Sequence, residues 1–132
     1  MRSEAVRFVA EHESAHCVLV AHFGYPVASV FVRRDGSGGT VWDAARASRA
    51  EQAAISAAGD VWDSELSDVD YRDIACEDLA RLVRLVGVGG VWAARRAARE
   101  VLTARRRLVL SLADRLELDR RIVFEPPVVS GG

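Results

Sequence analysis

The sequence contains no lysine, only two cysteines and no long run of apolar residues. All 18 basic residues are arginine, which we attribute to the coding bias of a GC-rich genome rather than to a mechanism. A phosphate-binding loop of the Walker type is excluded, because no Gly-x-x-x-x-Gly-Lys pattern occurs. No apolar run approaches the ~20 residues needed to cross a bilayer, and the charged N-terminus is not typical of a signal peptide. We therefore expect a soluble, cytoplasmic protein without a membrane segment.

The small number of cysteines and the balanced charge argue against a disulfide-stabilised protein and against a nucleic-acid-binding protein. Cys17 and Cys76 fall on predicted apolar helix faces, so we interpret them as small buried residues in a reducing compartment, not as a disulfide pair or zinc ligands. The net charge of -1 gives no general attraction to nucleic acid, which is not an expected partner. Half of the 132 residues are hydrophobic, which predicts one globular domain over residues 1–132.

The most informative stretch is the pattern His-Glu-x-x-His that starts at His12. Its flanks are apolar on one side and free of Pro and Gly, which predicts a helix over residues 3–23 with Ser3 as N-cap. Residues four apart lie on one face of a helix, so His12 and His16 can reach a single metal ion. Neutral imidazoles at this spacing suit Zn²⁺, and we predict both as ligands. Glu13 stands where such sites place the carboxylate that takes a proton from the metal-activated water.

Chance and a structural role are the competing interpretations of this pattern. A random match is expected roughly 0.005 times in a chain of this composition, so chance is a poor explanation. A buried structural pair of histidines is the alternative. The third histidine, His22, comes six residues after His16 on a different part of the helix, and we interpret it as a surface or end-of-helix residue.

Turn signals and apolar periodicity divide the rest of the chain. The glycine-rich residues 35–39 are interpreted as a flexible hairpin tip. Ser48 and Glu51 form a capping box that opens an Ala-rich helix, and Gly59 near its end favours close packing on the first helix. Residues 122–127 are interpreted as a terminal extension. The predicted class is mainly α with a small β-hairpin (α+β), with a zincin-like first helix packed in a helical domain. The predicted strands are 27–32 and 40–42, and the further helices are 48–62, 67–86 and 91–117.

An acidic stretch lies between residues 60 and 78, and a row of arginines follows on the last helix. Most of these charges are interpreted as solvated. The arginines are interpreted as electrostatic partners of the acidic stretch rather than as a nucleic-acid-binding surface. A zinc peptidase also needs a third protein ligand, while the fourth position stays open to water. Unless His22 is this third ligand, we predict that a carboxylate at the start of the 67–86 helix supplies it.

Taken in order, these segments resemble the peptidase domain of the FtsH-type ATP-dependent zinc proteases. Only the first matching motif is specific, but together the matches extend over most of the chain. In that family an Asp that opens the helix after the Ala/Gly-rich one is the third ligand, and here Asp68, Asp70 and Asp73 compete for this role. We prefer Asp70, because a capping Ser67 would place it in the first turn. The family's Ser-Asn-Asp flank is absent. The matching stretches are 12–18, 27–32, 57–59, 101–107 and 112–116.

The resemblance also implies a substrate and an assembly. The family offers the edge of one hairpin strand to a substrate peptide, which corresponds to residues 27–33 or 40–42 here. Its ring assembly implies a homo-oligomer, although those rings depend on an ATPase part. This sequence has no ATPase motif or membrane anchor, so we expect a free-standing relative that cleaves unstructured peptides or works with a separate unfoldase.

Three functions follow from these observations. The first is a zinc metalloendopeptidase in which Glu13 is the general base. The second is a catalytically silent, peptidase-like interaction module that docks a partner through its charged segments, although an intact Glu13 argues against it. The third is another His-Glu-x-x-His family, such as the small peptidases that cleave repressors of mobile elements, in which a later acidic residue is the third ligand.

Overall fold

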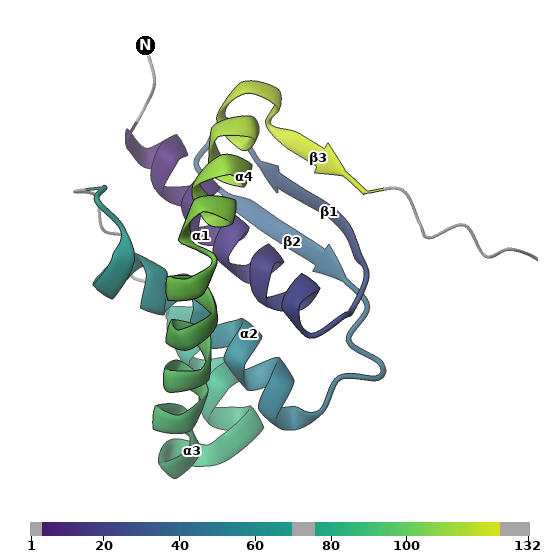
Figure 1. Cartoon of the computed structure of the whole chain (residues 1–132), viewed down its shortest axis with the longest axis vertical. Coiled ribbons are helices and arrows are strands. Elements are labelled where there is room, and N and C mark those ends of the chain that lie inside the picture. Colours follow the sequence, from purple (N-terminus) through teal and green to yellow (C-terminus); the bar gives the residue numbers. More distant parts are fainter. Residues whose placement is uncertain (1–3, 70–75, 125–132) are drawn as a thin grey trace, which may run out of the picture.

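The computed structural model describes residues 4–69 and 76–124 (Figure 1). It is mainly helical with a small antiparallel sheet, which confirms the predicted α+β class. Among the described residues, no helix has both the length and the apolar character that crossing a bilayer requires. The elements are α1 (Glu4–His22), β1 (Val27–Val32), β2 (Gly38–Trp42), α2 (Arg49–Val61), the π-helix η1 (Trp62–Leu66), α3 (Cys76–Ala104), α4 (Arg106–Asp119) and β3 (Arg121–Val123).

The sheet has the order β2-β1-β3, with both pairs antiparallel. The predicted hairpin is therefore present, and β2 begins at Gly38, two residues before the predicted start. The sheet also contains a strand that was not predicted: β3 includes residues 122 and 123, which were interpreted as the start of a terminal extension. In the described chain, β1 has a neighbour on both sides whereas β2 has one free edge. That difference leaves β2, not β1, available to pair with a peptide.

Helix α1 lies at the centre of the fold, between the sheet, α2 and α4 (Figure 1). One apolar cluster fills the space between α1, the sheet and α4, and includes Val30 and Leu116. A second cluster joins α1 to α2, α3 and α4, and includes Leu19 and Trp62. Because both clusters draw on α1, most of this helix is buried, including several of its polar residues.

Helix α2 begins as the sequence predicts. Ser48 accepts a hydrogen bond from the Glu51 backbone, and the Glu51 side chain accepts one from the Ser48 backbone, which completes the capping box. The alanines that face α1 and α3 are fully buried, so the expected tight packing of the Ala-rich helix is confirmed. Their small side chains let the helix backbones approach closely.

Three predicted boundaries differ from the structure. Residues 67–69 are not helical, and Ser67 ends η1 instead of capping the next helix, so the prediction of a helix from residue 67 is wrong. Only Gly87 breaks α3, with φ 70° and ψ 170°, and residues 88–90 are helical again. The last helix is interrupted at Arg105, where α3 ends and α4 begins. The predicted cap Ser3 lies outside the described residues.

Candidate functional site

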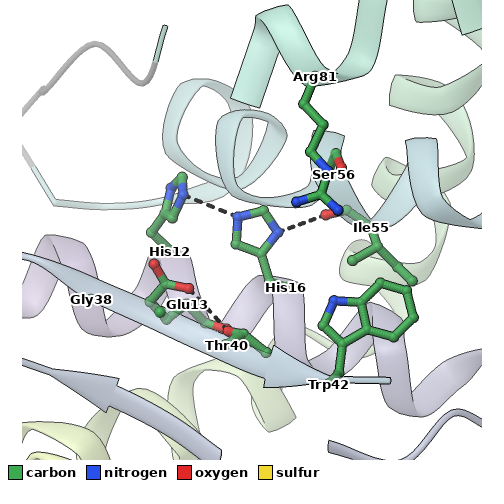
Figure 2. Close-up of a pocket in the computed structure, with 10 residues that line it drawn as sticks. His12, Glu13, His16, Gly38, Thr40, Trp42, Ile55, Ser56 and Arg81 are labelled. Carbon is green, nitrogen blue, oxygen red and sulfur yellow. Dashed lines mark hydrogen bonds between the residues drawn. The ribbon is translucent and has the colours of Figure 1, made fainter. Parts of the chain in front are cut away.

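Two imidazole rings converge on the buried side of α1. His12 and His16 stand one turn apart, as the His-Glu-x-x-His pattern predicts, and their Nε2 atoms are 3.1 Å from each other. The rings meet nearly edge to face, with centroids 4.7 Å apart. Both Nε2 atoms therefore point at one small region between the two rings (Figure 2).

The other nitrogen of each ring is held by an acceptor. His12 Nδ1 donates to Asp63 Oδ2 at 2.7 Å, and His16 Nδ1 donates to the Ile55 carbonyl oxygen at 2.6 Å. A carbonyl oxygen accepts only, as does an ionised carboxylate, so each Nδ1 carries the proton in the neutral ring. Each Nε2 then presents its lone pair to the other ring. A cation placed between them relieves the repulsion of the two lone pairs, and an outward Nδ1–H bonded to a carboxylate or carbonyl is the usual second contact of a metal-ligating histidine.

The π-helix η1 supplies the carboxylate that holds His12. Asp63 is its second residue, and its side chain is largely buried. Burial raises the pKa of Asp63 above its usual range, and the hydrogen bond from His12 opposes that rise. Its second oxygen, Oδ1, is buried and has no hydrogen-bond partner within residues 4–69 and 76–124. π-Helical turns occur often at functional sites, and here the turn carries a residue of the site.

Gly59 makes room for the His12 ring. A Cβ atom built at this position would stand 2.6 Å from His12 Nδ1 and 2.5 Å from Nε2, far inside van der Waals contact. No side chain fits between α2 and the imidazole. The close contact that the sequence predicted for Gly59 is therefore confirmed, and it is a contact with the predicted metal ligand itself.

Glu13 is held on the opposite side of the pocket by β2. The Thr40 hydroxyl lies 3.0 Å from both the backbone oxygen and the Oε1 atom of Glu13, so its single proton is shared between two acceptors. The second carboxylate oxygen points toward the side where the imidazoles lie (Figure 2). Gly38 also belongs to this contact, because a Cβ there would stand 3.1 Å from Glu13 Cγ. The predicted general base is thus fixed beside the histidine pair.

These groups open into one cavity of about 210 Å³. The histidines and Glu13 form its floor, β2 forms one wall, and α2 and α3 form the other (Figure 2). The glycine-rich segment is therefore more than the predicted hairpin tip, because two of its glycines lie in the wall. The lining residues are His12, Glu13, His16, Gly38, Gly39, Thr40, Trp42, Ile55, Ser56 and Arg81.

A second buried carboxylate lies next to the histidines on α1. Glu11 is 3 % exposed. Its Oε1 accepts hydrogen bonds from Trp62 Nε1 at 2.7 Å and from Ser67 Oγ at 2.9 Å, and its Oε2 accepts one from Arg7 Nε at 2.6 Å. This cluster fixes both ends of η1 to α1, and so holds the segment that carries Asp63.

The remaining predicted residues are placed as follows. Asp68 is exposed and its carboxylate pairs with Arg106 at 3.1 Å, on α4. The preferred third ligand, Asp70, and its competitor Asp73 lie outside the described residues. Among the residues that are described, no group of three or more His, Cys, Asp or Glu side chains is arranged to hold a metal ion. Cys17 is buried, as predicted, and burial raises the pKa of its thiol to about 11. His22 is exposed at the end of α1, as predicted.

Three residues of the site were not singled out in the sequence. Thr40 carries no local signal. Arg81 stood among many arginines with nothing to distinguish it. Asp63 had a usable signal, since it follows Gly59 by four residues and so lies on the same helix face as the residue that admits His12. No protein-family model and no curated protein matches this chain.

Proposed function

We propose that this chain is a zinc-dependent metallopeptidase of the FtsH type that hydrolyses unstructured peptides. One observation carries the proposal: the Nε2 atoms of His12 and His16 face each other while both Nδ1 atoms are held by acceptors. A structural histidine pair has no need to turn two lone pairs toward one point. A metal site requires it.

The spacing of the two nitrogens fits zinc. Two ligands at about 2.0–2.1 Å from a tetrahedral ion stand roughly 3.3 Å apart. The observed separation of the Nε2 atoms is 3.1 Å, so a small movement of either ring admits the ion. His12 and His16 would hold it, with Asp63 and the Ile55 carbonyl orienting them from behind. The third ligand stays a prediction, and both Asp70 and Asp73 lie outside the described residues. Asp63 accepts the hydrogen bond from His12 Nδ1, so it orients this histidine and is not proposed as a ligand.

The arrangement of the other residues supports peptide hydrolysis. When bound, Zn²⁺ supplies Lewis acidity that makes a water more acidic and polarises a carbonyl group. Glu13 takes the proton from the attacking water and later delivers it to the leaving amine. Thr40 keeps the Glu13 carboxylate on the pocket side. The free edge of β2 offers backbone groups to an extended peptide, which gives recognition that depends little on sequence.

The same geometry favours an unstructured substrate. A peptide that pairs with β2 has to be extended, because strand pairing uses the main chain of the peptide. We therefore propose that the substrates are unstructured peptides, or proteins delivered by a separate unfoldase.

Metal content of the purified protein is the first test. After zinc is supplied and excess is removed, elemental analysis should find about one zinc per wild-type chain. His16→Ala should lose it, since one of the two facing nitrogens is gone. His22→Ala is the matched control, because it removes an exposed histidine from the same helix and should keep the metal. A wild-type chain without zinc would overturn the proposal.

Glu13→Gln tests the chemistry separately from the metal. This variant should keep zinc and lose cleavage of a pool of unstructured peptides followed by mass spectrometry, because an amide cannot take the proton from water. Retained cleavage would show that Glu13 is not the base.

A catalytically silent interaction module is the alternative that these tests address. It would use the acidic and basic segments to dock a partner. Much of that charge is already paired within the chain: Arg95 contacts Asp60, Arg99 contacts Glu65 at 2.7 Å, and Arg106 contacts Asp68. These pairs confirm the prediction that the arginines are electrostatic partners of the acidic stretch. Because the paired charges already contact each other, docking of a partner protein through them is less favourable.

A further inference from the structure

A guanidinium group reaches into the same pocket from α3. Arg81 lines the cavity together with His16, Trp42 and Ser56, and its side chain points from α3 toward the His16 ring (Figure 2). Among the described residues that line the cavity, it is the one arginine. A permanent cation placed beside two metal-ligating imidazoles opposes metal binding, so its position needs another reason.

Three arginines in this part of the fold have anionic partners among the described residues. Arg95 and Arg99 on α3 pair with Asp60 and Glu65, and Arg106 at the start of α4 pairs with Asp68. No carboxylate of residues 4–69 or 79–124, the part of the chain whose side chains are described, forms an ion pair with Arg81. Glu13, the one carboxylate among the described lining residues, is turned to Thr40 instead. The pocket therefore presents a guanidinium that can form a two-pronged pair with an incoming carboxylate.

The place of Arg81 in the cavity separates it from the reacting atoms. Its tip lies on the Ile55 side of the His16 ring, whereas His12 lies on the other side (Figure 2). The carbonyl to be attacked must meet the region between the two Nε2 atoms and Glu13. A group bound to Arg81 therefore belongs to a neighbouring substrate residue, which an extended chain places about 3.4 Å farther along.

We propose that Arg81 binds a substrate carboxylate, so that the site prefers peptides with an acidic side chain or a free C-terminus next to the scissile bond. This inference rests on the proposed peptidase function. It names a specificity-determining residue and not a catalytic one, because the guanidinium contacts the substrate beside the bond that is broken.

Matched peptides provide the test. One unstructured peptide that the wild-type protein cleaves is prepared with Glu or Gln at each position flanking the cut, and in a second series with a free or amidated C-terminus directly after the flanking residue. The wild type should cleave the carboxylate member of one pair about 10-fold faster in kcat/KM, as expected for a charged hydrogen-bonded pair at an exposed arginine. The series in which the difference appears identifies the source of the carboxylate.

Variants assign the preference to Arg81. Arg81→Gln should remove it by slowing the carboxylate peptide about 10-fold while the neutral peptide is cleaved as before. Arg84→Gln is the matched control, since it removes an exposed arginine three residues along the same helix that does not line the cavity. It should keep both the preference and the zinc content. If Arg81→Gln slowed the cleavage of both peptides equally, the inference would be overturned. The guanidinium would then stabilise the transition state and would not recognise a substrate carboxylate.

A binding measurement separates this inference from the proposed function. Zinc-loaded Glu13→Gln protein is titrated with fluorescently labelled Glu and Gln peptides, and fluorescence anisotropy gives the affinities. A preference for Glu that Arg81→Gln abolishes supports carboxylate recognition, even if the wild type cleaves no peptide and the peptidase proposal fails. Cleavage without any preference, in rate or in binding, leaves the peptidase proposal standing and overturns the role of Arg81.

Discussion

Two buried polar clusters lie side by side on α1, and they are built in opposite ways. Around Glu11, every contact joins a donor to an acceptor: Arg7, Trp62 and Ser67 all donate to the carboxylate. Around His12 and His16, the outer nitrogens are satisfied in the same manner, but the inner nitrogens bring two lone pairs together at 3.1 Å. The first cluster pairs each donor with an acceptor, whereas the second has the arrangement expected of the proposed metal site.

The difference offers a way to tell a structural carboxylate from a proposed metal-binding histidine pair when both are buried. Burial alone does not separate them, because Glu11 is even less exposed than His16. The direction of the hydrogen bonds does. A cluster whose donors and acceptors match stabilises the fold, whereas acceptors that face each other are the arrangement expected of metal ligands.

Removing Glu11 should produce the largest effect and should act on folding. Glu11→Ala leaves Trp62 Nε1 and the Ser67 hydroxyl without their acceptor and removes one partner of Arg7. Breaking a buried charged cluster in this way should lower the free energy of unfolding by about 3–5 kcal/mol, measured by urea denaturation. The difference in unfolding free energy between the variant and the wild type should be the same when both proteins are measured with zinc and when both are measured with a chelator. Glu100→Ala, an exposed carboxylate on α3, is the control and should change stability by about 0.5 kcal/mol or less.

Gly59→Ala should produce a smaller effect on folding and a direct one on the metal. The added methyl group occupies the space of the His12 ring, so the ring or α2 has to move. Overpacking of this kind costs about 1–3 kcal/mol of unfolding free energy. Zinc content, measured by elemental analysis, should fall as well.

Gly89→Ala is the control for this change. Gly89 is helical and has open space where a Cβ would stand, so the substitution should be neutral or stabilise by about 1 kcal/mol. If Gly59→Ala bound zinc as tightly as the wild type, the ring of His12 would not be confined by α2 and the comparison would weaken.

Asp63→Ala should leave the fold largely intact and weaken the site. Without the carboxylate, His12 Nδ1 loses the acceptor that fixes its tautomer and ring orientation. The affinity for zinc should fall about 10–100-fold, measured by competition with a chromophoric chelator. Asp60→Ala removes an exposed carboxylate three residues earlier and should change the affinity by less than about twofold. Equal losses in the two variants would mean that general charge, not the contact with His12, supports the metal.

The parts of the fold that local signals specify were predicted well. The capping box placed the start of α2 at the residue after Ser48, and the breakers around residues 27–32 gave the bounds of β1. Strand β3 was missed because it has three residues and gains its structure from pairing with β1. The break at Arg105 was missed because no proline or glycine marks it, and the π-turn of η1 has no local sequence signal.

The same division applies to the site. His12, Glu13 and His16 were predictable because one helical turn brings them together. The contacts that complete the pocket come from residues far away in the chain, such as Thr40 and Arg81, and their meeting depends on how β2 and α3 pack against α1. The preferred ligand Asp70 rested on Ser67 as a helix cap. Ser67 instead donates to Glu11, so the physical basis for that choice among the three aspartates is lost.

The separation of His12 and Asp63 along the chain has a consequence for how the domain folds. The two histidines are four residues apart, so they can meet as soon as the first helix forms, and little chain entropy is lost. The contact with Asp63 spans 51 residues and closes a much larger loop. An ion that binds the histidine pair early would be bound before α2 and η1 have packed against α1. During refolding, binding of the ion by the two histidines should therefore come first, and the contact of His12 with Asp63 should form last.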